Sequence, residues 1–322
     1  MNIIEELKIN IKNTAPYIIK KIDIKDVKEW IYIFKDKSII QTDDIEKLKG
    51  IIVLALGYNL EKNKEDRKYM KVSSYYYFSN KYYHEINKVL EKLIEKGFKI
   101  KKLNNQNLKS LAVMSGVGYY GKNTLVHNEA FGSQMVLYAF GVYNEEKWDD
   151  INYKYSDCED CRICIESCPN QALKDFKLNR ERCIRNYTLE GVYIPKEIRE
   201  LLDNRLIGCD ICQEKCPKNE GKNSNLEKMK IIEKELLLPE TYINNWEKGL
   251  KKYIQDLSKI IGSNYARTNR VLSQSIISSG NLKKKSMIDN LKCLEKHQDK
   301  NIVEYSRWAV DNIKSRSDNF EY

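Results

Sequence analysis

The chain has 322 residues, of which 32% are charged and 42% apolar, and its formal net charge is +10. This length allows a sizeable buried core, and the composition excludes a disordered chain. The longest apolar run, residues 51–56, is too short to span a membrane, and residues 1–10 lack the pattern of a signal peptide. We therefore expect a cytoplasmic protein without a membrane partner.

The positive charge favours a polyanionic partner such as nucleic acid. The lysines are spread through a sequence rich in Ile, Lys and Asn, so the charge alone also fits a general bias in composition.

The first 155 residues have the pattern of a mixed α/β fold. Residues 51–56, followed by Gly57, predict a buried strand, and residues 134–142 predict a second one. Apolar residues in 84–97 fall on one face of a helix that Gly97 would end, and residues 108–114 predict a shorter helix.

Residues 115–124 contain three glycines within six positions, Gly116, Gly118 and Gly121. Such spacing indicates tight turns or a close approach of the backbone to a ligand. By itself, however, a glycine-rich loop is more often an ordinary connection than a cofactor site.

The chain beyond residue 225 has a helical pattern throughout. Amphipathic segments recur at 236–239, 254–261, 271–277 and 302–313, with breaks expected at 280–281 and near 299–301. Successive paired helices of this length suggest a fragment of an α-solenoid.

Eight of the nine cysteines form a repeated pattern between these two parts. Residues 158–169 read C-x2-C-x2-C-x3-C-P, the spacing of bacterial two-cluster ferredoxins, in which the fourth cysteine reaches the other cluster. A second run ends at Cys216 and Pro217. Crossed ligation therefore predicts two 4Fe–4S clusters. One would be held by Cys158, Cys161, Cys164 and Cys216, and the other by Cys168, Cys183, Cys209 and Cys212.

Zinc is the alternative for such cysteine pairs, because a zinc site also takes four thiolates. Four cysteines in the eleven residues 158–168 are too crowded for one tetrahedral zinc, whereas eight cysteines fit two clusters. The ninth, Cys293, lies in a helical pattern and is expected to be a buried thiol. Because a simple electron carrier needs only the cysteine module, the long flanking segments suggest that something else is bound and reduced.

At this point the chain resembles the cobalamin-dependent epoxyqueuosine reductases of tRNA modification. The resemblance rests on the glycine loop 116–123, on the cysteine run 158–169, on 182–184 with 188–190, and on 204–205 leading into 208–213. Residues 267–281 and 307–309 resemble the HEAT-like repeat of that family.

The resemblance implies an α+β chain in three parts. Residues 1–149 would form an α/β cobalamin-binding domain, 150–222 a ferredoxin-like module with two 4Fe–4S clusters, and 223–322 a helical HEAT-like region that helps to hold tRNA. The implied reaction is the reduction of epoxyqueuosine to queuosine at the wobble position, with cobalamin reduced through the clusters. The implied partners are the tRNA anticodon stem-loop and an external electron donor such as a flavodoxin or ferredoxin, and we expect a monomer.

The resemblance also places cofactor-binding groups. The backbone of Gly121, Lys122 and Asn123 and the side chain of Ser133 would lie near the corrin ring.

The sequence departs from the family where the substrate would bind. The family has a proton-donating aspartate before the glycine loop, but this chain has no Asp or Glu between Gly97 and Asn128. The catalytic residue is therefore unknown, with Tyr119, Tyr120 and His127 as candidate donors. We expect His127 to be a loop histidine that faces solvent.

A second departure is at residues 80–84, where only Tyr83 and His84 remain of the family's Arg-Asp-Tyr-His. These losses leave two alternatives open. One is a cobalamin and iron–sulfur reductase that acts on a different substrate, and the other is an electron carrier without catalysis of its own.

Overall fold

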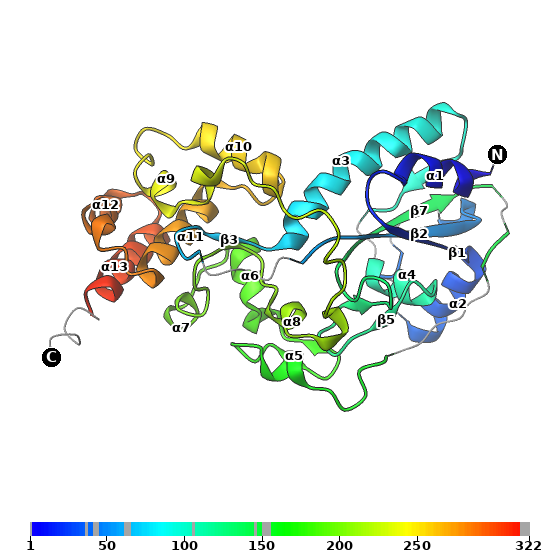
Figure 1. Ribbon diagram of the computed structural model, residues 1–322, viewed down its shortest axis with the longest axis horizontal. Helices are drawn as coiled ribbons and strands as arrows, with labels where there is room; N and C mark the ends of the chain where they lie inside the picture. Colours follow the sequence, from blue (N-terminus) through cyan, green and yellow to red (C-terminus); the bar gives the residue numbers. More distant parts are fainter. Residues whose placement is uncertain are drawn as a thin grey trace.

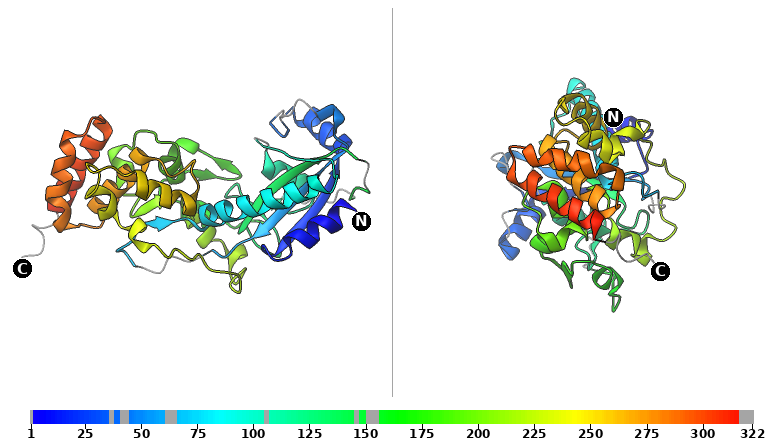
Figure 2. Two further views of the ribbon diagram at one scale, coloured as in Figure 1. Left: turned by 90° about the horizontal axis from the view of Figure 1, so that it is seen from above. Right: turned by 90° about the vertical axis from the view of Figure 1, so that its left-hand side faces the viewer.

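The computed structural model describes residues 2–35, 38–40, 45–60, 66–104, 107–144, 147–149 and 156–315. The molecule is elongated, with an N-terminal sheet at one end, the last helices at the other and the cysteine-bearing segment between them (Figures 1 and 2). Within the described residues, none of the helices has the length and apolar character needed to cross a membrane.

The N-terminal sheet has four antiparallel strands in the order β1-β2-β7-β4. Their bounds are Tyr17–Asp23 for β1, Gly50–Gly57 for β2, Met135–Val142 for β7 and Ile100–Lys102 for β4. Both strands predicted from the sequence are confirmed as the central pair. Every residue of β2 is buried because helices cover both faces of the sheet, which explains its unbroken apolar sequence.

Alternate residues of β2 enter two different cores. Ile51 and Val53 pack with residues of α2 (Ile24–Phe34) and α4 (Leu108–Met114) on one face. Ile52 and Leu54 pack with α1 (Ile3–Ile11) and α3 (Ser74–Glu95) on the other.

The helix α3 contains the predicted helix but begins ten residues before it. Its first turns are rich in tyrosine, and Tyr76 and Phe78 are buried there. Gly97 follows the helix with φ +87°, as a terminating glycine should. Ile94, which the apolar pattern placed on the buried face, is 52% exposed, because the buried stripe ends at Leu93.

The middle of the chain is built from short elements. They are β5 (Tyr119–Tyr120), β6 (Val126–His127), α5 (Ile163–Glu166), β8 (Leu173–Lys174), β9 (Lys177–Leu178), α6 (Ile184–Leu189), α7 (Lys196–Arg199), β10 (Arg205–Ile207) and α8 (Ile211–Glu214). The strand β10 pairs in parallel with β3 (Lys71–Val72), so the cysteine-bearing segment is hydrogen-bonded to the N-terminal part of the chain.

The C-terminal part is helical, as predicted. Its helices are α9 (Pro239–Ile243), α10 (Lys251–Ile261), α11 (Thr268–Asn281), α12 (Ile288–Cys293) and α13 (Lys300–Lys314). The expected break at 280–281 is confirmed, because α11 ends at Asn281. Gly280 is also a close contact between α11 and α13. A Cβ there would lie 3.0 Å from the Ala309 Cα.

Cys293 is exposed, which corrects the expectation of a buried thiol. The buried residues beside it are Leu291 and Leu294, so α12 turns its apolar side inward and Cys293 outward.

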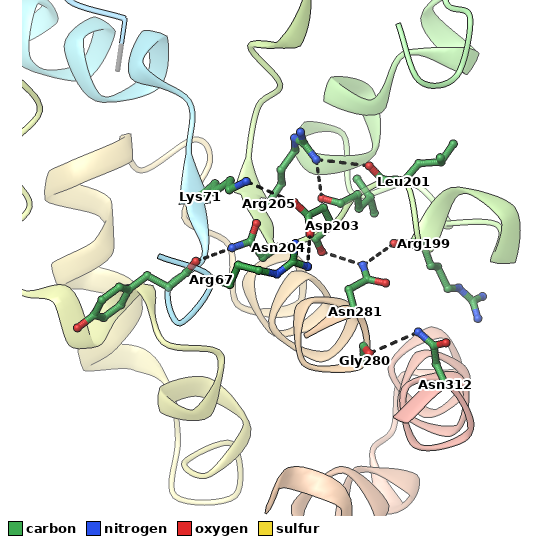
Figure 3. Close-up of polar contacts among 12 residues, drawn as sticks. Arg67, Lys71, Arg199, Leu201, Asp203, Asn204, Arg205, Gly280, Asn281 and Asn312 are labelled. Carbon is green, nitrogen blue, oxygen red and sulfur yellow. Dashed lines mark hydrogen bonds and ion pairs between the residues drawn. The ribbon is translucent and has the colours of Figure 1, made fainter. Parts of the chain in front are cut away.

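The three parts of the chain meet around Asp203, shown in Figure 3. The Asp203 carboxylate pairs with Arg67 at 3.0 Å and with Lys71 at 3.4 Å. On its other side, the Asn281 amide on α11 donates to the backbone carbonyls of Arg199 and Asp203, each at 2.8 Å. This junction joins the cysteine-bearing segment to β3 with the residues just before it, and to the helix α11.

Candidate functional site

Three cysteines of one short run and a fourth from much later in the chain line one cavity. They are Cys158, Cys161, Cys164 and Cys216, the set expected for the first cluster. Among the described residues, no group of three His, Cys, Asp or Glu side chains is arranged to hold a single metal ion.

The chemistry of this cavity fits a cationic cluster. Burial, together with charge repulsion from the other three cysteines, raises the pKa of Cys164 to about 11. Thiolates packed together in a buried cavity repel one another, and iron would offset that repulsion.

A second group of cysteines forms beside the first. Burial raises the pKa of Cys209 to about 11 and that of Cys212 well above its usual value, and Cys183 adds to both shifts. The Cys168 sulfur accepts a hydrogen bond from the Ala172 amide at 3.2 Å. Its place as the fourth ligand of the second cluster stays a prediction.

The second cysteine loop is held against the start of α3. Gly208 has φ +81°, and a Cβ on it would lie 2.4 Å from the Ser73 Cβ. The Asp210 carboxylate accepts hydrogen bonds from the Ser73 hydroxyl at 2.6 Å and from the Ser74 amide at 3.2 Å. Burial raises the pKa of Asp210 to about 6, although the hydrogen bond from Ser73 opposes this shift.

The glycine loop lies against the first cysteine group. The Lys122 amide donates to the Cys158 sulfur at 3.4 Å, and the Lys122 ammonium donates to the Glu159 carbonyl at 2.6 Å. Lys122 and Asn123 both line the cysteine cavity. A Cβ on Gly121 would lie 2.6 Å from the His127 ring, so this backbone has room only for glycine.

His127 is buried, with 1% of its surface exposed, which corrects the expectation that it faces solvent. The pairing of β5 with β6 turns it inward, opposite Tyr119, and its ring stacks on the Tyr119 ring. Its Nε2 lies 3.0 Å from the Asn123 Oδ1. Burial, together with the charge of Lys218, lowers the pKa of His127 to about 4, so its imidazole is neutral near pH 7.

The two tyrosines of the loop differ in their surroundings. Tyr119 is 9% exposed, and burial raises its pKa. The Tyr120 hydroxyl lies 3.1 Å from the Ser110 Oγ on α4.

Lys109 on α4 is a partly buried cation that no sequence motif singled out. Its ammonium donates to the Thr124 carbonyl, at the end of the glycine loop, at 2.8 Å. Burial and the nearby Arg185 lower the pKa of Lys109, whereas Cys212 and Cys183 raise it. Lys109 therefore lies between the glycine loop and the second cysteine group. The sequence gives one indication of its role, which is that Lys109 lies in the segment where the family has its proton-donating aspartate.

Ser133 lies at the junction of the sheet and the cysteine-bearing segment. Its hydroxyl donates to Gln213 Oε1 at 3.1 Å and accepts from Asn219 Nδ2 at 2.9 Å. Its contact with a corrin, like that of Gly121, Lys122 and Asn123, stays a prediction.

The divergent residues 80–84 lie on α3. The Asn80 amide donates to the Lys259 carbonyl at 2.8 Å, Lys81 pairs with Glu227, and the Tyr82 hydroxyl donates to the Gly57 carbonyl at 2.9 Å. These contacts hold α3 against the chain around it.

Comparison with known proteins agrees with the motifs. Residues 157–219 match the family model of a 4Fe-4S double cluster binding domain. The chain is 27% identical over 286 residues to the epoxyqueuosine reductase of Lactococcus garvieae, and this alignment covers 84% of the chain and 80% of that protein.

The fold is also similar to solved structures. The epoxyqueuosine reductase of Streptococcus thermophilus superposes with a TM-score of 0.75 at 22% identity, over 98% of this chain and 91% of that one. A crystal structure of epoxyqueuosine reductase with an epoxyqueuosine-modified tRNA stem loop gives 0.71 at 22% identity, over 96% and 89%. At these identities the likeness establishes a shared fold.

Proposed function

The chain belongs to the epoxyqueuosine reductase family, and we propose that it reduces epoxyqueuosine to queuosine at the wobble position of tRNA. The observation that carries this proposal is the cavity lined by four cysteines and by the glycine loop. It supports an electron-transfer centre next to the loop that would bind the second cofactor.

The chain carries two 4Fe–4S clusters, and cobalamin is expected in this family. We assign one cluster to Cys158, Cys161, Cys164 and Cys216 and the other to Cys168, Cys183, Cys209 and Cys212. We further propose three parts with limits at 1–149, 150–222 and 223–322, of which the last is a HEAT-like repeat.

The glycines let this loop pack closely against β6, because a side chain at Gly118 or Gly121 would meet His127. A Cβ on Gly118 would lie 2.2 Å from the His127 carbonyl oxygen, and one on Gly121 would strike the His127 ring. The backbone of Gly121, Lys122 and Asn123 would hold cobalamin there, with Ser133 nearby. Bound cobalamin would supply, in its reduced form, the electrons that open the epoxide.

Opening the epoxide also requires a proton at its oxygen, and Lys109 is the best candidate donor. His127 is neutral near pH 7, and the pKa of Tyr119 is raised, so both are weak acids there. Lys109 is a cation whose pKa is lowered by burial, which makes its ammonium a better acid than an exposed lysine.

We also propose the partners, the location and the oligomeric state that the sequence led us to expect. The substrate is the anticodon stem-loop of tRNA, the reductant is an external donor such as a flavodoxin or ferredoxin, and the protein acts as a cytoplasmic monomer.

A second candidate function is favoured by one observation. No Asp or Glu occurs between Gly97 and Asn128, where the family has its proton donor. A cobalamin and iron–sulfur reductase with a different substrate would not need an acid at that place.

Expression of the chain in cells that lack their own epoxyqueuosine reductase separates the two candidates. Digested tRNA from these cells should contain queuosine, read by mass spectrometry as epoxyqueuosine less one oxygen. A Cys212→Ser variant should leave epoxyqueuosine in place. Persistence of epoxyqueuosine with the wild-type chain, expressed with both clusters present, would favour the different substrate.

A further inference from the structure

A cavity of about 200 Å³ lies between the cysteine-bearing segment and the C-terminal helices. Its walls come from residues 187–194 on one side and from α11 and α13 on the other, elements that lie beside one another in Figure 1. It shares no residue with the cavity of the first cysteine group.

One face of α11 brings two arginines and a glutamine to this cavity. Arg267, Arg270 and Gln274 are three and four residues apart, so they lie along the same side of the helix. Arg267 is the N-cap of this 14-residue helix and makes no side-chain cap. The first-turn amides, which point out of the helix end, therefore add to the positive charge.

Among the described residues, Arg270 has no acidic side chain within salt-bridge distance and is held by backbone carbonyls. Its Nη1 donates to the Asn264 and Tyr265 carbonyls, both at 3.3 Å, and its buried Nε has no partner among the described residues. Burial and repulsion from Arg267 lower its pKa, and Glu190 acts in the opposite direction. Glu190 is itself paired with Arg180 at 2.6 Å.

The Asp299 carboxylate, which lines the cavity, accepts hydrogen bonds from other groups. Asp299 caps α13, with one oxygen 2.9 Å from the Asn301 amide and the other 2.9 Å from the Asn269 side chain. The arginine charge is therefore not neutralised by Asp299.

Gln274 supplies an independent sign of a ligand. It is 1% exposed, and its Nε2 donates to the Tyr187 carbonyl at 3.1 Å. Because a carbonyl oxygen only accepts hydrogen bonds, the side-chain amide of Gln274 cannot be flipped by 180°. Its Oε1 is therefore a buried acceptor without a partner in the described part of the chain. A ligand there must donate a hydrogen bond.

The chemistry of the ligand follows from these groups. It must offer an anion to Arg267 and Arg270 and, about one helical turn away, a hydroxyl to Gln274. We infer that this cavity binds a ribose-phosphate unit of the RNA backbone, with a phosphate on the two arginines and the adjoining 2′-hydroxyl on Gln274. The inference rests on the proposed function, because it concerns how the RNA substrate is held.

Salt dependence of RNA binding tests the phosphate contact without any turnover. The full chain with its clusters is titrated with a fluorescent, unmodified anticodon stem-loop at several salt concentrations. Each of Arg267→Gln and Arg270→Gln should weaken binding and reduce the slope of log K against log salt by about 0.7–0.9. Arg307→Gln is the matched control, because Arg307 lies outside the cavity and is paired with Glu295 at 3.0 Å.

The hydroxyl contact is tested with an all-2′-deoxy stem-loop of the same sequence. Wild-type protein should prefer the RNA form, and Gln274→Met, which keeps the side-chain volume, should lose that preference. Iron content and thermal unfolding show whether each variant is folded.

Three results would overturn the inference. The arginine variants could have the same slope as Arg307→Gln, the folded Gln274→Met could keep the full RNA preference, or adenosine monophosphate could bind the cavity as tightly as the stem-loop does. The last result would indicate a free-nucleotide site. Because these measurements use unmodified RNA, they can fail while epoxyqueuosine is still reduced, and they can succeed when it is not.

Discussion

At the scale of single residues, the site depends on glycines that have no room for a side chain and on the cation Lys109, which the sequence did not predict. The sequence predicted the cysteines by their spacing and the glycine loop by its density of glycine. It could not predict that His127 is buried, because two-residue strands such as β5 and β6 leave no periodic signal. Lys109 was missed for a similar reason, since one lysine among many gives no sign of its own burial.

Gly121 should be intolerant of any side chain. In Gly121→Val, the added atoms would collide with the His127 ring and with Asn123 Oδ1, which lie 2.6 and 2.8 Å from the Cβ position. We expect the variant to lose bound cobalamin, measured by absorbance after gel filtration, while its iron content stays at the wild-type value. Unchanged cobalamin content would reject the placement of the corrin against this loop.

Lys109→Met should slow reduction by about 10²–10⁴-fold, the usual contribution of a general acid, with cobalamin and iron contents unchanged. Lys109→Arg should not restore the rate, because a guanidinium scarcely gives up its proton. The exposed Lys92 provides the control substitution.

The dependence of the reduction rate on pH provides a second test of Lys109 as the proton donor. A donor must be protonated, so the wild-type rate should fall as pH rises through the pKa of Lys109, which burial lowers. If Lys109→Met kept this alkaline decline and most of the rate, another group would be the donor.

At the scale of elements, the second cysteine loop depends on its contact with α3. The sequence predicted the helical face of α3 from Ile86, Val89 and Leu93, and all three are buried. It could not show that the first turn of this helix receives the Asp210 carboxylate. That contact joins residues 136 positions apart, and only the tertiary structure brings them together.

Gly208→Ala should release the second cluster. The substitution adds a Cβ where the Ser73 Cβ is 2.4 Å away, in a backbone conformation that already costs other residues about 1–2 kcal/mol. We expect the iron content of the reconstituted protein to fall by half.

Gly221→Ala separates the effect of backbone strain from the effect of the collision with Ser73. Gly221 has φ +70° but no atom within 4 Å of its Cβ position, so this variant carries the backbone strain without the collision. Equal iron loss in both variants would show that strain, rather than contact with α3, is responsible.

At the scale of the whole molecule, buried polar contacts join the parts of the chain. Arg199 on α7 is 2% exposed and pairs with Glu304 on α13. Its guanidinium also lies 4.7 Å from the centre of the Tyr305 ring. The helical character of the C-terminal part was predictable from its periodicity, but this arginine, in a polar stretch of sequence, carries no sign that it is buried.

Glu304→Gln should lower the free energy of unfolding by about 1–3 kcal/mol at pH 7, since it leaves a buried guanidinium without its charged partner. Glu295→Gln removes the partner of the exposed Arg307 and should cost at most about 1 kcal/mol. Urea unfolding of both variants measures the difference, and equal losses would contradict this role for Arg199.

The difference in stability between Glu304→Gln and the wild-type protein should also depend on pH. Burial opposes ionisation of Glu304, but hydrogen bonds from Arg199 and Tyr193 outweigh it and hold its pKa below the usual value. The stabilisation is therefore fully present above pH about 4.5 and is lost as pH falls through the lowered pKa. Glu304→Gln and wild type should accordingly converge in stability only under acidic conditions.

The central claim is that electrons pass through the clusters to a cobalamin that reduces epoxyqueuosine in tRNA. The most direct measurement uses purified protein reconstituted without oxygen with iron, sulfide and cobalamin, then given a strong reductant and tRNA that carries epoxyqueuosine. Mass spectrometry of the digested nucleosides should show queuosine, one oxygen lighter, and none when cobalamin is omitted. Intact epoxyqueuosine in the presence of both clusters and reducible cobalamin would contradict the account.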